Sequence, residues 1–249
     1  MNIGAAIGKP FGNIKNLVIG LILMIIPVVN ALTIPGYLIR VAGRTMNNDN
    51  TLPNFGNFGE LIIDSIKYIV ISIVMMIPAM IVLFIALGSL VIGAISAAAM
   101  SGSTEMVQQE LTTVILGGLA AASGLIVLGI ILAVIGMILI ISGVMNYAKT
   151  RQFGKAFAIK ENLRSFFTGS FLIAIIVSIV LAIILAFIVG IMIGLAALIP
   201  AVGIWIALII TVIFDFVIMV MIYSLLGDGY PHGAVAVPQA KPVQPAKPM

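Results

Sequence analysis

Four uninterrupted apolar blocks dominate the sequence and limit what it can fold into. They cover residues 69–98, 111–146, 169–195 and 201–226. Each block exceeds the ~20 residues that an α-helix needs to cross about 30 Å of hydrocarbon. Only 8% of the residues are charged, which is too few to cover the surface of a soluble domain. The chain is therefore predicted to be all-α, a polytopic integral membrane helical bundle with four spanning helices.

The charges of the connecting loops predict which side of the membrane each loop occupies. Residues 99–110 carry two glutamates and no Lys or Arg, and the turn near Pro200 is uncharged. Residues 147–168 carry one glutamate and five basic side chains, Lys149, Arg151, Lys155, Lys160 and Arg164. Basic loops remain on the cytoplasmic side, so this loop and the earlier one with Arg40, Arg44 and Lys67 are predicted to be cytoplasmic. We expect a multi-pass protein of the plasma membrane.

The apolar run at residues 17–40 is interrupted by two prolines and an asparagine. A full crossing would place Lys9 and Lys15 outside, against the charge rule. Proline removes an intrahelical hydrogen bond, and asparagine can satisfy the backbone groups that are freed. We therefore favour a re-entrant hairpin of two short helices, residues 16–26 and 30–46, broken at Pro27 and Asn30. A kinked full span, and a signal peptide with a cleavage site at residues 29–31, are the alternatives.

Two further segments of the predicted cytoplasmic loops are amphipathic. One face of the first carries Glu60, Asp64 and Lys67, and one face of the second carries Lys160, Glu161 and Arg164; isoleucine, leucine and phenylalanine lie on the opposite faces. Such segments are typical of helices that lie in the membrane interface. Residues 1–226 are thus predicted to form a single membrane domain. Residues 227–249 are rich in proline and alanine and are predicted to be a disordered cytoplasmic tail.

Residues 36–80 carry a pattern that resembles a known family. The matching positions are Gly36, Tyr37, Arg40, Leu52, Pro53, Phe55, residues 58–61, Asp64, Lys67 and Pro78, together with Lys9, Pro10 and Phe11. The pattern is similar to that of an uncharacterised prokaryotic membrane family, domain of unknown function 4013, which is common in archaea. The resemblance covers about the first third of the chain and implies a bacterial or archaeal cytoplasmic membrane. It implies no catalytic residue.

Asp215 is the ionisable residue deepest within an apolar block. Thr211 precedes it by one helical turn, and Tyr223 follows two turns later on roughly the same face. A carboxylate at such a depth is costly, and intramembrane carboxylates often relay protons or bind ions. The alternative is a structural role, in which a protonated Asp215 would bond to Ser178 or Asn146 on another helix.

Small residues and basic residues suggest two further roles. Ser89, Gly93 and Ala97, and also Gly190 and Gly194, recur at four-residue spacing, which permits close approach of helices; we expect them to contribute to packing within the bundle. The basic side chains at residues 149–164 alternate with phenylalanines, which suits contact with anionic lipid headgroups. The same charges would also set the orientation of the chain in the membrane.

The residue inventory argues against an enzyme. The chain has no cysteine and one histidine, His232, and it shows no zinc-ligand spacing or phosphate-binding loop. Asp215 and Asp228 lie about 20 Å apart along one helix, too far to act as a protease pair. We therefore expect no catalytic residue, metal, cofactor or nucleic-acid partner.

The favoured function is that of a non-enzymatic structural or accessory membrane subunit that organises lipid or partner proteins. Its expected partners are membrane lipids and, in addition, further copies of the chain or other membrane proteins. The alternative is a small transporter or channel in which Asp215 handles protons, cations or a small solute.

Overall fold

A computed structural model describes residues 2–100 and 104–231, and all regular secondary structure in these residues is helical. The four longest helices are α4 (Phe58–Met100), α5 (Thr104–Thr150), α7 (Gly169–Ala197) and α8 (Gly203–Gly229). Each contains a stretch long and apolar enough to cross a membrane. The predicted all-α class with four long apolar helices is therefore confirmed.

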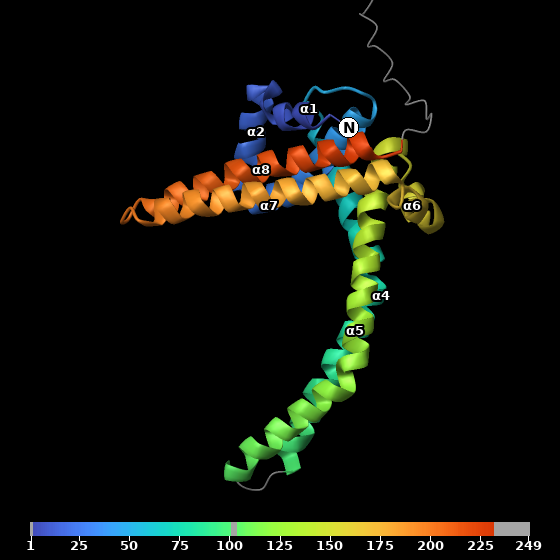
Figure 1. Cartoon of the computed structure of the whole chain (residues 1–249), viewed down its shortest axis with the longest axis vertical. Coiled ribbons are helices and arrows are strands. Elements are labelled where there is room, and N and C mark those ends of the chain that lie inside the picture. Colours follow the sequence, from blue (N-terminus) through green and yellow to red (C-terminus); the bar gives the residue numbers. More distant parts are fainter. Residues whose placement is uncertain (1, 101–103, 232–249) are drawn as a thin grey trace, which may run out of the picture.

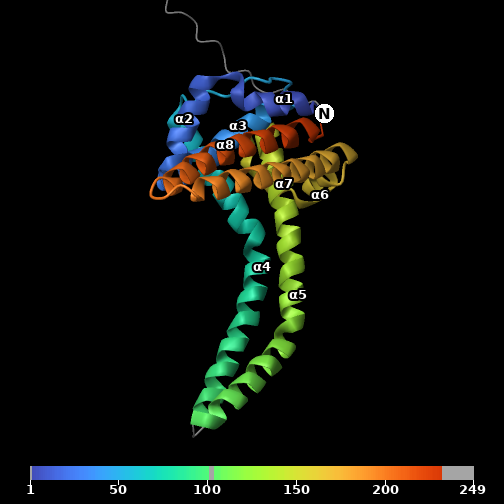
Figure 2. The same cartoon turned by 60° about the vertical axis from the view of Figure 1, so that its left-hand side comes forward.

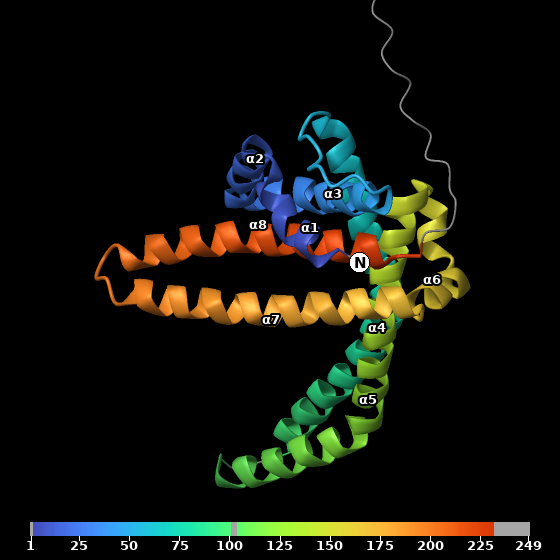
Figure 3. The ribbon, with the colours of Figure 1, turned by 45° about the horizontal axis from the view of Figure 1, so that its top comes forward.

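The four long helices form two antiparallel hairpins, and the hairpins meet at one end. α4 packs along α5, and α7 packs along α8. The α7–α8 hairpin lies across the end of the α4–α5 hairpin and does not run beside it (Figures 1 and 3). Away from this junction both hairpins expose large apolar side chains, such as Phe84 and Phe187. Such surfaces are compatible with lipid and not with water.

Most of the buried side chains gather where the two hairpins meet. One buried cluster joins Ile71 of α4, Tyr147 of α5, Phe171 of α7 and Leu226 of α8. A second cluster packs α3 (Pro27–Met46) against α8, with Tyr37 and Phe216 at its centre. Figure 2 shows α3 beside α8 at this junction. The interior of the protein is therefore concentrated at the end of α4 and α5 that carries the charged residues.

The N-terminal apolar run is divided into two helices, as the sequence predicts, but the second helix begins at Pro27 and not at residue 30, so Asn30 lies within it. α2 (Ile14–Ile25) ends before the extended residue Ile26, and Pro27 is the first residue of α3. Proline is well suited to this position because the first helical N–H has no intrahelical partner. The Asn30 amide donates to the carbonyl of Met24 at 3.5 Å, which satisfies a group freed by the break. Re-entry of this hairpin into a membrane stays a prediction.

The first residues of the chain lie over the end of α8. α1 (Ile3–Gly8) is followed by the short 3-10 helix η1 (Lys9–Gly12), and both contact α8. The buried Lys9 ammonium donates to the Thr45 hydroxyl and to the carbonyl of Asp49, 3.2 Å away. Burial lowers the pKa of Lys9 to about 8, although the Asp49 carboxylate raises it. This contact holds the N-terminus against the end of α3.

The two amphipathic segments of the sequence behave differently. The second is a separate helix, α6 (Ile159–Phe166), which follows the 3-10 helix η2 (Phe153–Phe157). α6 buries Phe166 and leaves Lys160, Glu161 and Arg164 exposed, so its apolar face packs on the protein. The segment with Glu60, Asp64 and Lys67 is the uninterrupted start of α4. The position of both segments in a membrane interface stays a prediction.

The end of the helical domain lies slightly later than predicted. α8 continues past residue 226 to Gly229, and Tyr230 packs edge-on against Phe171 with ring centroids 5.1 Å apart. These aromatic side chains fix the end of α8 against α7. The remainder of the predicted tail, residues 232–249, lies outside the described residues.

The contact between α3 and α8 predicts opposite effects of alanine at two helical glycines. A Cβ on Gly227 would collide with the backbone of Ala42, whereas a Cβ on Gly190 would meet nothing within 4 Å. We expect Gly227→Ala to destabilise the protein by about 1–3 kcal/mol through overpacking. Gly190→Ala should be neutral or stabilising by up to about 1 kcal/mol, because alanine favours the helix. Thermal unfolding in detergent measures both, and equal effects would contradict the α3–α8 packing.

Candidate functional site

The carboxylate of Asp64 forms the centre of a cluster of charged side chains at the base of α4. Its Oδ1 accepts a hydrogen bond from the Tyr147 hydroxyl at 2.5 Å. Its Oδ2 accepts from Arg40 Nε at 3.3 Å and from Arg151 Nη1 at 3.1 Å. The side chain of Asp64 is only 9% exposed. One buried carboxylate therefore joins α3, α4 and the end of α5.

A glycine allows α3 and α4 to approach closely enough for these contacts. A Cβ on Gly36 would collide with the Leu61 carbonyl of α4. The backbone N–H of Gly36 also donates to the Ser65 hydroxyl at 2.8 Å. Arg40 lies one turn after Gly36, and Asp64 lies directly before Ser65. The close approach at the glycine therefore brings the Arg40 guanidinium to the Asp64 carboxylate.

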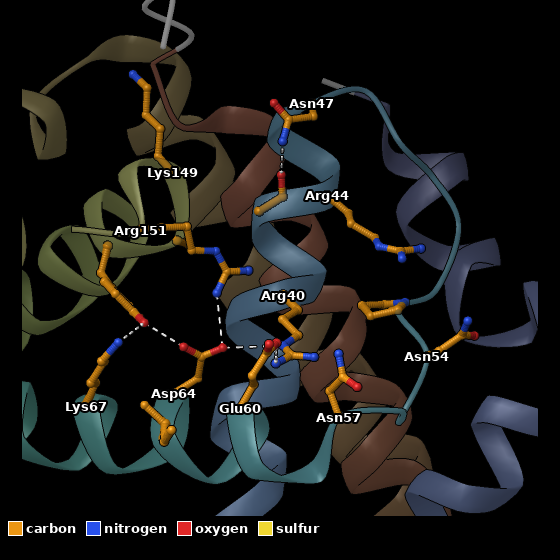
Figure 4. Close-up of a pocket in the computed structure, with 15 residues that line it drawn as sticks. Arg40, Arg44, Asn47, Asn54, Asn57, Glu60, Asp64, Lys67, Lys149 and Arg151 are labelled. Carbon is orange, nitrogen blue, oxygen red and sulfur yellow. Dashed lines mark hydrogen bonds and ion pairs between the residues drawn. The ribbon is translucent and has the colours of Figure 1, made fainter. Parts of the chain in front are cut away.

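Arg151 reaches the cluster because it occupies an unusual backbone conformation. It follows the last residue of α5 with φ 56°, and its N–H bonds to the Tyr147 carbonyl at 2.8 Å. This left-handed conformation at the end of a helix is usually adopted by glycine. A residue with a Cβ atom adopts it at a cost of about 1–2 kcal/mol. The cap turns the chain so that the Arg151 side chain points back toward α4, as Figure 4 shows.

Two further contacts extend the cluster along α4. Lys67 donates to the Tyr147 hydroxyl at 3.0 Å, and its ammonium lies 5.2 Å from the Tyr147 ring centroid. Glu60, which is largely exposed, accepts from Arg40 Nη2 at 3.1 Å. Asp64 thus receives three donors, while Glu60 is bonded by Arg40 at the surface.

The loop between α3 and α4 forms a wall beside this cluster. Phe55 stacks on Tyr37 with ring centroids 4.1 Å apart, which anchors the loop in the core. Asn16 donates to the Pro53 carbonyl and to Asn54 Oδ1, each at 3.1 Å. Asn57 has φ 58°, a conformation that asparagine tolerates better than most residues. The loop is therefore fixed on both sides.

Contacts of Arg44 close the same loop from the side of α3. Arg44 Nη1 donates to the Thr51 hydroxyl at 2.8 Å and to the Leu52 carbonyl at 3.1 Å. Burial raises the pKa of the nearby Asp49, but hydrogen bonds from Thr51 and the charges of Arg44 and Lys9 outweigh this and lower it overall. Asp49 is therefore ionised at neutral pH and helps to hold Arg44 in place.

These elements enclose a pocket of about 650 Å³, called the basic pocket below. Its lining includes five basic side chains and two acidic ones, with three asparagines. The charged and amide residues are Arg40, Arg44, Lys67, Lys149, Arg151, Glu60, Asp64, Asn47, Asn54 and Asn57. Figure 4 shows Arg40, Glu60, Asp64, Lys67 and Arg151 meeting around the Asp64 carboxylate, while Lys149 points away from this group. An excess of positive charge in a concave site favours an anionic ligand.

Several donors in the basic pocket have no partner within the described residues. Arg40 uses Nε and Nη2 for Asp64 and Glu60, which leaves Nη1. Arg44 bonds through Nη1, which leaves Nε and Nη2. Arg40 and Arg44 are four residues apart on α3 and so lie on one face. Both residues line the basic pocket, which makes their unused N–H groups candidate donors to an anionic ligand.

The predicted basic residues divide into two groups in the structure. Lys149 and Arg151 line the basic pocket, and Lys149 also donates to the Pro231 carbonyl at 2.8 Å. The other three, Lys155, Lys160 and Arg164, are exposed on η2 and α6 and are not among its lining residues. Sequence reasoning assigned Arg40, Arg44 and Lys67 to orientation and missed them as parts of one site. Two spacings could have indicated the site: Arg40 and Arg44 are four residues apart, and Asp64 and Lys67 are three apart, so each pair lies on one helical face.

The three intramembrane polar candidates make no hydrogen bond to one another within the described residues. Asp215 is exposed on α8 and does not line the basic pocket. The Thr211 hydroxyl bonds to the Ala207 carbonyl of its own helix at 2.9 Å, and Tyr223 bonds to Tyr68 of α4. A role for Asp215 therefore finds no support from its two predicted companions.

The predicted structural partners of Asp215 bond elsewhere or have no partner. The hydroxyl of Ser178 is buried without a hydrogen-bond partner in the described residues. Asn146 donates to the Lys155 carbonyl at 3.1 Å and to Asn162 at 2.9 Å. Asn146 therefore ties α5 to η2 and α6, and it does not reach α8.

Of the predicted packing residues, Gly190, Gly194 and Ser89 show no close helix contact in the described residues, while the prediction for Gly93 and Ala97 stays open. A Cβ on Gly190 or Gly194 would meet no atom within 4 Å. Ser89 is exposed, and its hydroxyl bonds to the Ala86 carbonyl of the same helix. The neighbouring Gly93 is half-buried, and the side chain of Ala97 lies outside the described part. Close packing at Gly136 and Gly227 was not predicted, although a Cβ on either would collide with a neighbouring helix.

Loss of the Asp64 charge should destabilise the junction of the helices. Asp64→Asn breaks the largely buried pair with Arg40, which costs on the order of 3 kcal/mol, and also removes the carboxylate partner of the more exposed Arg151. Glu60→Gln removes a carboxylate that is 68% exposed, so it should change the free energy of unfolding by less than about 1 kcal/mol. Chemical unfolding in detergent measures the difference. Equal effects of the two substitutions would contradict the central role of Asp64.

Comparison with known proteins assigns the chain to a family. Residues 19–195 match the family described as Protein of unknown function (DUF4013). This range contains every residue of the basic pocket and extends far beyond the first third of the chain. Searches of curated proteins and of solved structures gave no match. Because the match covers more than half of its length, the chain belongs to the DUF4013 family of proteins of unknown function.

Proposed function

We propose that this protein is a non-enzymatic structural or accessory protein of the plasma membrane that binds anionic lipid headgroups. The observation that carries the proposal is the basic pocket, whose lining includes five basic side chains and only two carboxylates. The binding site would lie on the cytoplasmic face, where the predicted topology places its loops. The C-terminal tail would lie on the same side.

The position of the basic pocket supports a ligand that comes from the membrane. Part of its lining belongs to the first turns of α4 and to the last turn and cap of α5, and the rest to α3 and the loop that follows it. These are adjacent ends of helices that are long and apolar enough to span a bilayer. Headgroups of the inner leaflet would lie at this depth. Each basic side chain near an anionic membrane surface contributes about 1 kcal/mol.

The chemistry of the basic pocket supports binding over catalysis. Its lining contains no serine, threonine, cysteine or histidine. Asp64 accepts three hydrogen bonds from charged or hydroxyl groups, which leaves it a poor general base. The remaining groups are mostly fixed cations and amides, which bind and orient anions. Additional partners would be further copies of the chain or other membrane proteins, in contact with its exposed apolar helices.

Retention of anionic lipid by the purified protein tests the proposal. We expect native mass spectrometry to detect anionic phospholipid bound to the wild type after extraction from mixed membranes. The pair Arg44→Gln and Lys149→Gln, combined, should reduce this retention about tenfold or more, because two of the basic contacts are removed. The matched control is Lys160→Gln with Arg164→Gln, which removes the same charge from α6. Equal loss in both double variants would refute a role for the pocket.

The alternative, transport through Asp215, lacks support from the geometry around that residue. We therefore expect proteoliposomes with the Asp215→Asn variant to show the same proton or cation flux as those with the wild type. A pH-sensitive dye inside the vesicles, or ion-selective electrodes, would report it. A flux by the wild type that Asp215→Asn abolishes would replace the proposed function by transport.

A further inference from the structure

We infer that the basic pocket selects a phosphorylated polyol, meaning a phosphate ester that carries free hydroxyl groups. Among membrane lipids this chemistry is that of a phosphoglycerol headgroup. The inference rests on the proposed function and goes further, because it names the ligand class that the pocket distinguishes from other anions. It is argued from the donors and acceptors that remain unused in the pocket.

The phosphate would be bound by the two arginines on one face of α3. Arg40 Nη1 and Arg44 Nε and Nη2 have no partner within the described residues. Guanidinium groups are planar and match the oxygens of a phosphate by paired hydrogen bonds. Asp64 and Glu60 hold the Arg40 side chain, and Thr51 and Leu52 hold that of Arg44. Both groups are therefore ordered before a ligand binds, which reduces the entropic cost of binding.

The three asparagines supply what hydroxyl groups need, which is both donors and acceptors. Asn47 uses its Nδ2 for the Gly43 carbonyl at 2.9 Å, which leaves its Oδ1 as an acceptor. Asn54 uses its Oδ1 to accept from Asn16, which leaves its Nδ2 as a donor. The amide of Asn57 makes no hydrogen bond within the described residues, so it offers both groups. A hydroxyl both donates and accepts, and amides satisfy it in both directions.

The same pocket is unfavourable for a headgroup that contains an ammonium. Asp64 is bonded by Tyr147, Arg40 and Arg151, and Glu60 is bonded by Arg40. No carboxylate in the lining is therefore without a cationic partner. An added ammonium would be repelled by the surplus of basic side chains. Phosphoserine and phosphoethanolamine headgroups should bind less well than phosphoglycerol, even where the net charge of the lipid is equal.

The size of the pocket also favours a phosphate ester over the simple ion. A volume of about 650 Å³ lies within the range of about 300–1,000 Å³ typical of small-molecule sites. A phosphate ion alone would fill only a small part of this space. The glycerol portion would place its hydroxyls against Asn54 and Asn57, which lie on the same side of the pocket in Figure 4.

Lipid competition on the full-length protein tests the selectivity. The protein, in nanodiscs of phosphatidylcholine, receives equal amounts of phosphatidylglycerol and phosphatidylserine, and native mass spectrometry measures which is retained after delipidation. We expect phosphatidylglycerol to be retained about tenfold better, which corresponds to the loss of one or two hydrogen bonds and an unfavourable ammonium. Equal retention of both lipids would overturn the inference and leave anionic lipid binding intact. Retention of neither would overturn the proposed function as well.

Two asparagines of the same loop provide matched variants. Asn57 and Asn48 have almost the same backbone conformation, with φ 58° and 59°, but only Asn57 lines the basic pocket. Glycine tolerates this conformation, so Asn57→Gly and Asn48→Gly should both fold. We expect Asn57→Gly to reduce the preference for phosphatidylglycerol over phosphatidylserine about fivefold, because a hydrogen bond to the glycerol portion is lost. Asn48→Gly should have no effect, and an equal effect of both would overturn the inference.

Soluble competitors distinguish the two sources of the same chemistry. If glycerol 3-phosphate displaces phosphatidylglycerol, the pocket binds the phosphorylated polyol without lipid tails, and its ligands include soluble molecules of this class. If glycerol 3-phosphate does not displace it while the lipid preference holds, the source is the membrane lipid. Displacement by inorganic phosphate as effective as by glycerol 3-phosphate would overturn the role of the hydroxyls.

Discussion

The buried carboxylate of Asp64 is the contact on which the rest of the junction depends, because side chains from three separate segments bond to it. Tyr147, Arg40 and Arg151 all donate to its two oxygens. An isolated charge at such a site would cost several kcal/mol, because it is removed from water without a partner. Two guanidinium groups and a hydroxyl offset that cost, and in return α3, α4 and the end of α5 are held in one geometry. The pocket is the space that this geometry leaves beside the loop at residues 47–57.

The two arginines also connect the structural role of Asp64 to binding. Arg40 and Arg151 both line the basic pocket and use only part of their donors for Asp64, so the interaction that fixes their position leaves further N–H groups that a ligand could use. Surface lysines, in contrast, move freely and lose entropy when they bind a headgroup. Lys160 and Arg164 on α6 are of this exposed type. The account therefore separates general attraction to the membrane, which any basic loop provides, from selection of one headgroup, which needs ordered donors.

The sequence predicted the parts of the fold that depend on local pattern. Apolar length predicted the four long helices, and the chemistry of Pro27 and Asn30 predicted the break between α2 and α3. It did not predict that these helices form two hairpins, one across the other, because apolar surfaces look alike whichever neighbour they pack against. The site was only partly predictable for a related reason. Lys149 and Arg151 were identified as headgroup contacts. The contact between Asp64 and Arg151, however, depends on the positive φ of Arg151. A positive φ can be expected from the sequence at a glycine but not at an arginine. Asp215 was predicted as a functional residue only because it lies deep within an apolar block of the sequence. Its neighbours in the sequence do not show that its side chain is exposed on α8.

The most direct measurement is the proximity of a lipid phosphate to the arginines of the basic pocket. Solid-state NMR on protein with ¹⁵N-labelled arginine side chains, in bilayers containing phosphatidylglycerol, detects a ³¹P nucleus within about 5 Å of a guanidinium nitrogen through their dipolar coupling, a distance that direct hydrogen bonding implies. The chain has four arginines, and Arg164 is the one that lies away from the cluster and the pocket. The account predicts that the coupling persists in Arg164→Lys and is strongly reduced in Arg44→Lys. A coupling that is lost in Arg164→Lys and unchanged in Arg44→Lys would contradict it.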